Sequence, residues 1–271
     1  MADMTTKTSF PRADNSTPMQ TTVIQTYRID DQPDWIATCL RSTEAWAKTN
    51  DWAYFFRGDD IFDLVPPAFR EKFSNQKPLQ IDIARLLWAR EIFDTNVATE
   101  RVIWLDSDVF VFDSGAIHID PTLDFALGRQ IWVQPGQDGR HRTYRQVHNA
   151  ILVINRSTPV LDFLIQTVLT LAERHDGPAS PQFLGPKLLT ALHNIVGFPV
   201  IESVGMTSPL VLGDLATGGG PALSQMANAM DSPLGAVNLC SSYRNQTVDG
   251  IHCDDGVFED AINTLNTRGL R

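Results

Sequence analysis

The chain has 271 residues, of which 43% are hydrophobic and 20% are charged, so it can bury a core of ordinary size and is neither wholly disordered nor collagen-like. Lys and Arg number 22 against 32 Asp and Glu, and the formal net charge of −10 argues against a surface that follows many phosphates of a nucleic acid. A ligand with one or two phosphates fits if an Arg, a helix N-terminus or a divalent cation separates it from the carboxylates.

The N-terminal sequence lacks the apolar run of a signal peptide, and the most apolar stretch, 188–201, is interrupted by polar residues, Gly and Pro. We therefore expect no membrane span and a cytoplasmic location. The three cysteines are odd in number and lack CxxC spacing, so they predict neither a disulfide framework nor a structural zinc site.

Residues 1–20 are rich in Thr, Ser, Asp, Asn and Pro and predict a flexible tail, followed by a single domain over 21–271. The hydrophobic pattern predicts strands at 22–27, 53–57 and 101–105, and helices at 33–48 and 78–93. Strands that alternate with helices of this length favour an α/β fold with a parallel sheet.

The second half predicts strands at 131–133 and 150–154 and an amphipathic helix at 159–173. The segment 213–235 contains Gly-Gly-Gly-Pro and many small residues. It predicts a long loop, which is either mobile and functional or a disordered surface insertion.

The strongest local signal is Asp106-Ser107-Asp108, which follows the apolar strand at 101–105 and precedes another apolar run. Ligands of open α/β sheets bind beyond the carboxyl ends of strands, and two aspartates one residue apart offer hard oxygen ligands to Mg²⁺ or Mn²⁺. The same residues could merely cap a turn. The flanking apolar runs favour the metal site.

One family that shares this pattern is the haloacid-dehalogenase phosphatases, in which an apolar strand leads to Asp-x-Asp-x-Thr/Val. That resemblance implies Asp106 as nucleophile and Asp108 as general acid, with Val109 at the fourth position. It also requires a second acidic pair, for which Asp254 and Asp255 are the candidates. Because two strands precede the motif here, this is the alternative interpretation.

The second resemblance covers nearly the whole chain. The matching stretches, in order, are 24–28 (IQTYR), 80–86 (QIDIARL), 106–108 (DSD), 148–152 (HNAIL) with Pro159, 185–190 (GPKLLT) and His252. In this order they resemble the DXD glycosyltransferases that include mannosyltransferases and bacterial capsular polysaccharide enzymes, with a DXD strand like that of the glycogenin family.

This resemblance implies a GT-A-like (Rossmann-like) α/β fold with a mixed, mostly parallel sheet. It implies a hexosyltransferase that uses Mn²⁺ or Mg²⁺ to move a sugar from a UDP- or GDP-sugar to a hydroxyl acceptor, with retention of configuration. The acceptor class, whether glycan, lipid, protein or small molecule, stays open. A non-catalytic module that binds nucleotide sugars is a third interpretation.

The resemblance also assigns residues. Asp106 and Asp108 would hold the metal with His252, and they would form the catalytic set with Asn149. The implied donor-binding residues are Gln25, Thr26, Tyr27, Asp82, Arg85, Ser107, Gly185 and Pro186. Chemistry alone leaves other roles open: Asp82 and Arg85 as a surface ion pair, Asn149 as a cap, and His252 as a solvated residue.

Overall fold

The computed structural model describes residues 20–270, so nearly all of the predicted tail lies outside the described residues. Its centre is a six-stranded sheet in the order β2-β1-β3-β6-β5-β7. The strands are β1 (Thr21–Thr26), β2 (Ala53–Arg57), β3 (Arg101–Leu105), β5 (Phe125–Pro135), β6 (His141–Asn155) and β7 (Val200–Ile201). Because only β6 runs against the others, the predicted α/β fold with a mixed, mostly parallel sheet is confirmed.

The central strands are apolar because both of their faces are covered. Every residue of β1 and β3 is buried. Ile24 and Trp104 point into one core, whereas Val23 and Ile103 point into another. A strand buried on both faces shows as a continuous apolar run, which explains why β3 matches its predicted range.

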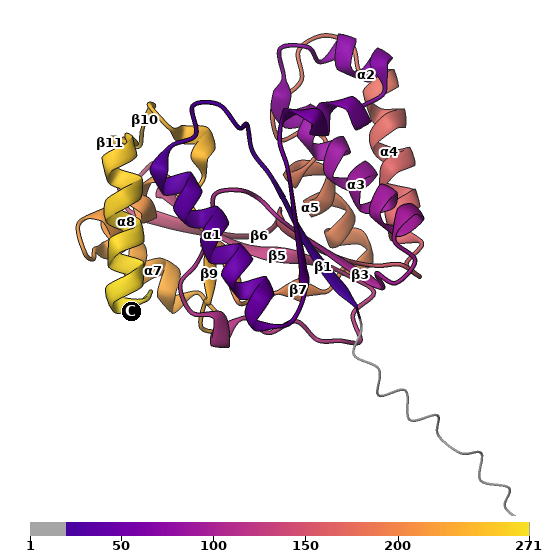
Figure 1. The fold of residues 1–271 in the computed structure, drawn as a ribbon. Coiled ribbons are helices and arrows are strands. Elements are labelled where there is room, and N and C mark those ends of the chain that lie inside the picture. Colours follow the sequence, from indigo (N-terminus) through magenta and orange to yellow (C-terminus); the bar gives the residue numbers. More distant parts are fainter. Residues whose placement is uncertain (1–19, 271) are drawn as a thin grey trace, which may run out of the picture.

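Helices α2 (Pro67–Lys72), α3 (Lys77–Thr95), α4 (Val160–Arg174) and α5 (Pro186–Val196) cover one face of the sheet. Figure 1 shows them gathered on one side of the strands. The longest, α3, buries Ile83 and Trp88 against this core, and the ring of Trp88 meets that of Trp104 edge-on with centroids 6.3 Å apart. The helix leads directly into β3.

A smaller sheet and a second group of helices lie on the other side (Figure 1). The sheet joins β4 (Val109–Val111), β9 (Ala236–Asn238) and β8 (Val204–Met206), and the helices are α1 (Asp34–Thr49), α6 (Pro209–Ala216), α7 (Pro221–Asn228) and α8 (Asp255–Arg268). Trp35 of α1 stacks on Phe258 of α8, with centroids 4.1 Å apart. A short hairpin of β10 (Thr247–Val248) and β11 (Ile251–His252) precedes α8.

The prediction of a loop at 213–235 is wrong, because α6 ends and α7 lies within this segment. The carboxylate of Asp214 accepts the backbone N–H groups of Ala222 and Leu223 at 2.7 and 2.9 Å, which caps the start of α7. Leu212 and Leu215 are buried in a further core, to which α1, α6, α7 and α8 contribute. The segment is therefore ordered by buried apolar side chains and by the cap from Asp214, although its glycines alone suggested mobility.

Strands β5 and β6 form a long ribbon that contains an irregularity. Leu127 pairs with Leu152, but the next residue, Gly128, pairs with His148, so β6 has three additional residues there. A Cβ on Gly128 would lie 2.2 Å from the His148 ring, so the close approach requires glycine. These three additional residues leave Asn149 beside the carboxyl end of β3.

Among residues 20–270, no helix is long and apolar enough to cross a membrane.

Candidate active site

A cavity of about 1280 Å³ opens beyond the carboxyl ends of β1 and β3. Thr26 and Tyr27 line it at the end of β1, and 106–108 line it after β3. Parallel strands direct their carboxyl ends to the same edge of a sheet, where ligands of such folds bind. The sequence motif therefore lies at the wall of this cavity.

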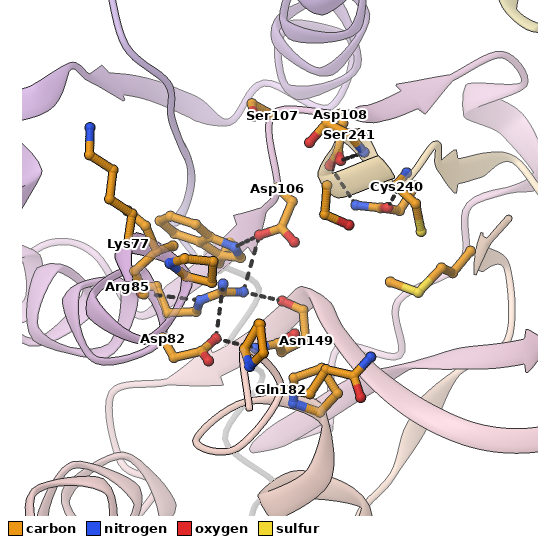
Figure 2. Close-up of a pocket in the computed structure, with 18 of the residues that line it drawn as sticks. Lys77, Asp82, Arg85, Asp106, Ser107, Asp108, Asn149, Gln182, Cys240 and Ser241 are labelled. Carbon is orange, nitrogen blue, oxygen red and sulfur yellow. Dashed lines mark hydrogen bonds and ion pairs between the residues drawn. The ribbon is translucent and has the colours of Figure 1, made fainter. Parts of the chain in front are cut away.

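The two oxygens of Asp106 have different surroundings. Oδ1 accepts the indole N–H of Trp104 at 2.7 Å and an N–H of Arg85 at 3.1 Å (Figure 2). Oδ2 has no hydrogen-bond partner within residues 20–270, and the side chain is 26% exposed. One oxygen of Asp106 is therefore fixed by donors, while the other is free to bind a ligand.

Arg85 connects three parts of the site. Its Nη1 also donates to the backbone oxygen of Asn149 at 2.6 Å, and its Nη2 lies 3.2 Å from Oδ1 of Asp82. The guanidinium lies over the Trp104 ring, 4.9 Å from the centroid. Asp82 and Arg85 are three residues apart on α3 and both only 6% exposed, so they form a buried pair and not a surface one.

Asp82 is held from a second direction, because Nδ2 of Asn149 donates to its Oδ1 at 2.8 Å. Burial raises the pKa of Asp82 to about 6, although Arg85 and Asn149 both act to lower it. Gly185 packs against Asp82 and Asn149. A Cβ on Gly185 would lie 2.6 Å from both carboxylate oxygens of Asp82 and 2.7 Å from Nδ2 of Asn149. Pro186, the first residue of α5, lines the cavity.

Asp108 is buried and held by the C-terminal part of the chain. Its Oδ1 accepts Nδ2 of Asn238 at 2.5 Å, and its Oδ2 accepts the backbone N–H of Ser241 at 2.7 Å (Figure 2). Burial, followed by the charge of Asp106, raises the pKa of Asp108 to about 6. A divalent cation at this point would offset both effects.

These residues fit Mg²⁺ or Mn²⁺ because both carboxylates supply hard oxygen ligands, and Asp106 keeps Oδ2 free. Within the described range, no three His, Cys, Asp or Glu side chains are grouped to hold a metal. A cation here would therefore rest on Asp106 and Asp108, with its other positions open to phosphate oxygens or water.

His252 is not brought to this point. It is exposed on β11, its Nδ1 lies 3.1 Å from the hydroxyl of Thr247, and it does not line the cavity. Gln25 also stays outside: it is fully buried, donates to the backbone oxygen of Asp106 at 3.0 Å and accepts the Tyr54 hydroxyl at 3.0 Å. Gln25 thus supports the turn that carries Asp106.

The other predicted donor residues line the cavity, except for Gly185, which is buried behind Asp82 and Asn149. Thr26, Tyr27 and Ser107 line it, although the hydroxyl of Thr26 donates to the backbone oxygen of Arg57 at 2.7 Å. The structure therefore unites the predicted residues of β1, α3, the 106–108 turn and β6 around one hollow.

The acidic pair required by the phosphatase interpretation lies elsewhere. Asp254 caps α8 by accepting the N–H of Val257 at 3.1 Å. Asp255 accepts two hydrogen bonds from Arg244, both at 2.6 Å, and one from Trp35 at 2.8 Å. Neither aspartate lines the cavity, so neither joins Asp106 and Asp108.

Sequence reasoning missed Asn238 and Ser241, which lie more than 125 residues beyond Asp108 and carry no motif. It also missed the cavity wall formed by β5 and β6, which includes Gln130, Trp132 and Gln134. A signal for this wall existed, because polar and aromatic residues alternate there with the apolar Ile131 and Val133.

No protein-family model matches the sequence, and a search of curated proteins finds no match. Among solved structures, the chain is similar to a glycosyltransferase involved in glycosylation of the major capsid of PBCV-1, with 12% identity, coverage of 82% of this chain and 94% of that one, and a TM-score of 0.44. It is similar to mouse xyloside xylosyltransferase 1 in the apo form, with 10% identity, coverage of 82% and 98%, and a TM-score of 0.43.

A weaker likeness is to a Drosophila β-1,4-galactosyltransferase 7 variant in complex with manganese, UDP-Gal and xylobiose. Here identity is 10%, coverage is 64% of this chain and 73% of that one, and the TM-score is 0.30.

Proposed function

We propose that this chain is a metal-dependent glycosyltransferase of the GT-A type that moves a sugar from a UDP- or GDP-sugar to a hydroxyl acceptor. One observation carries the proposal: Asp106 and Asp108 meet the buried pair Asp82–Arg85 at the wall of one large cavity, and Asp106 keeps an oxygen free. With a cation bound by the two aspartates of the 106–108 turn, this arrangement would combine a centre for phosphate oxygens with polar groups suited to sugar hydroxyls.

In this proposal, each element at the cavity supplies residues with one role. Thr26 and Tyr27, at the end of β1, contact the nucleoside. A cation held by Asp106 and Asp108 would neutralise charge on the leaving nucleoside diphosphate. Arg85 holds Oδ1 of Asp106 so that Oδ2 stays available.

Asp82 and Asn149 supply an acceptor and a donor for the hydroxyls of the transferred sugar. We further propose that the transfer retains the anomeric configuration, as the sequence resemblance implies. The anomeric signal of the product in proton NMR tests this.

The test is release of nucleoside diphosphate from UDP-, GDP-, ADP- and dTDP-sugars, each with Mn²⁺, with Mg²⁺ and with EDTA. We expect one donor to be cleaved only with metal, and Asp108→Asn to be at least about 100-fold slower. Asp260→Asn is the matched control, because Asp260 is exposed on α8 outside the cavity.

The proposal fails if no donor is cleaved and no nucleoside diphosphate binds in a metal-dependent way. Metal-dependent binding without any turnover would instead favour a non-catalytic module. Release of inorganic phosphate from p-nitrophenyl phosphate would favour the phosphatase, which we do not expect because Asp254 and Asp255 are committed to α8 and Arg244.

A further inference from the structure

One wall of the cavity is a face of the β5–β6 ribbon. Register pairs Gln130 with Gln146 and Trp132 with Tyr144 across the two strands, and Gln134 continues the row on β5. All five residues line the cavity. Because side chains alternate along a strand, these cross-strand neighbours lie on the same face of the ribbon.

The opposite face of the ribbon is already used by the protein. Ile131 and Val133 are buried in the core to which α1, α6, α7 and α8 contribute. Thr143 accepts a hydrogen bond from Gln225 of α7 at 2.7 Å, and Arg145 forms an ion pair with Asp231 just after that helix. The ribbon is therefore held from behind, and its cavity face is presented on a rigid support.

The cavity face, by contrast, has unused polar groups. Within residues 20–270, no hydrogen bond joins the three glutamine amides, the indole N–H of Trp132 or the hydroxyl of Tyr144 to another side chain or to the backbone. Trp132 contacts Tyr243 at a tilt of 41°, with centroids 6.1 Å apart, and Tyr144 is 45% exposed. Rings and amides thus remain available to a ligand.

We infer that this face, which we call the ribbon platform (Gln130, Trp132, Gln134, Tyr144 and Gln146), binds an uncharged carbohydrate acceptor. The inference rests on the proposed function and names its acceptor class. A pyranose has an apolar C–H face that packs on an aromatic ring, and a rim of hydroxyls that both donate and accept hydrogen bonds, as glutamine amides do.

The chemistry of the ribbon platform separates carbohydrate from other acceptors. None of its five side chains is charged, so nothing in it favours a phosphorylated or acidic acceptor. An alkyl chain laid on it would leave the amides without hydrogen bonds, which is costly once water is displaced. Its three rows span about 13 Å along the strands, which leaves room for more than one sugar ring.

The experiment measures binding of methyl glucoside, galactoside, mannoside and xyloside, and of maltose, cellobiose and lactose, by saturation-transfer NMR. Each is tested with and without nucleoside diphosphate and Mn²⁺. We expect at least one glycoside to bind, with saturation strongest at its ring C–H protons.

Variants locate the site. Trp132→Ala and Gln146→Ala should each raise the Kd of that glycoside by about tenfold, while Trp132→Phe keeps a ring and loses less. Phe55→Ala is the matched control, because Phe55 lies on β2 outside the cavity with a 44% exposed ring. Neither the control nor the platform variants should change the Kd for nucleoside diphosphate.

Two outcomes overturn the inference: no glycoside binds the wild type, or binding is unchanged in folded Trp132→Ala and Gln146→Ala. If Trp132→Ala does not fold, the exposed positions Gln146 and Tyr144 decide through their alanine variants. Glycoside binding without nucleotide binding would overturn the proposed function and leave the ribbon platform standing. Nucleotide binding without glycoside binding would overturn the ribbon platform as an acceptor site and leave the proposed function standing.

Discussion

Arg85 is the residue on which the charge balance of the site depends, because its guanidinium is shared between Asp82 and Asp106. Arg85→Met would leave two carboxylates near each other without their cation. We expect it to lower the free energy of unfolding by about 3–5 kcal/mol at pH 7, measured in urea.

Two comparisons identify the cause. Arg85→Met with Asp82→Asn should recover part of the loss, because a buried charge is then removed. Arg90→Met, on the same helix, breaks only an exposed pair with Asp162 and should cost less than about 1 kcal/mol. Equal losses for Arg85→Met and Arg90→Met would contradict the proposed charge balance.

His148 gives the protein a pH-dependent stability. Its Nδ1 accepts the N–H of Ala150 at 3.1 Å, so that nitrogen is unprotonated and Nε2 donates to the backbone oxygen of Val204 at 3.2 Å. Burial lowers the pKa of His148 to about 4. The unfolded chain binds a proton near pH 6.5, so stability is present above that pH and is lost as pH falls toward 4.

We expect the step from pH 7 to pH 5 to cost the wild type about 2 kcal/mol more than His148→Gln, which does not titrate. Urea unfolding at the two pH values measures this. The raised pKa values of Asp82 and Asp108 push stability the other way in both proteins and cancel in the comparison. Parallel pH profiles would show that His148 does not titrate in this way.

At the scale of elements, the loop before α5 closes the site through Gly185. Gly185→Ala places a methyl group against Asp82 and Asn149, so one of them must move. We expect KM for the nucleotide sugar to rise by about tenfold and stability to fall by about 1–3 kcal/mol. Gly115→Ala is the control, because its Cβ would meet nothing nearer than 3.5 Å. An unchanged KM in Gly185→Ala would remove this loop from the donor site.

An element could be predicted from the sequence when the residues that stabilise it are its own neighbours in the chain. Residues 53–57 and 101–105 match β2 and β3 in full, because both ends of each strand are marked by local pattern. The segment 213–235 was misjudged because α7 depends on the carboxylate of Asp214, eight and nine residues before the amides that it caps. Local composition contains no trace of such a contact.

The same division applies to the candidate site. The contact of Asp82 with Arg85 could be predicted because three-residue spacing on one helix puts them together, whereas their burial and their place in the site could not be read from that spacing. Asn149 could be associated with them only by resemblance, because its position depends on the irregular pairing of β5 with β6. Asn238 was beyond prediction, because its bond to Asp108 depends on the pairing of β4 with β9.

At the scale of the whole molecule, the cavity joins two cores. Ile81 packs against the core under α3 and α4, whereas Tyr27 and Tyr243 pack against the core of α1, α6 and α8, and all three line the cavity. A ligand that fills the hollow therefore contacts both halves of the fold. Its binding energy should stabilise both against unfolding.

We expect Mn²⁺ with the cognate nucleoside diphosphate to stabilise the protein by about 2.7 kcal/mol at 100 times its Kd, in a single shifted thermal transition. EDTA should abolish the shift, and Asp108→Asn should not show it. A transition that splits on ligand addition would mean that only one of the two cores responds to the ligand.

The hydrogen bonds that Asn238 and Ser241 donate to Asp108 have a consequence for the order in which the site forms during translation. Asp108 leaves the ribosome well before Asn238 and Ser241, the residues that bind its two oxygens, and β4 must wait equally long for β9. A nascent chain that ends before 236 can therefore form β1, α3 and β3 but has an uncapped aspartate at their edge. The proposed metal–nucleotide site can therefore be completed only after Asn238 and Ser241 have been synthesised, whichever core forms first.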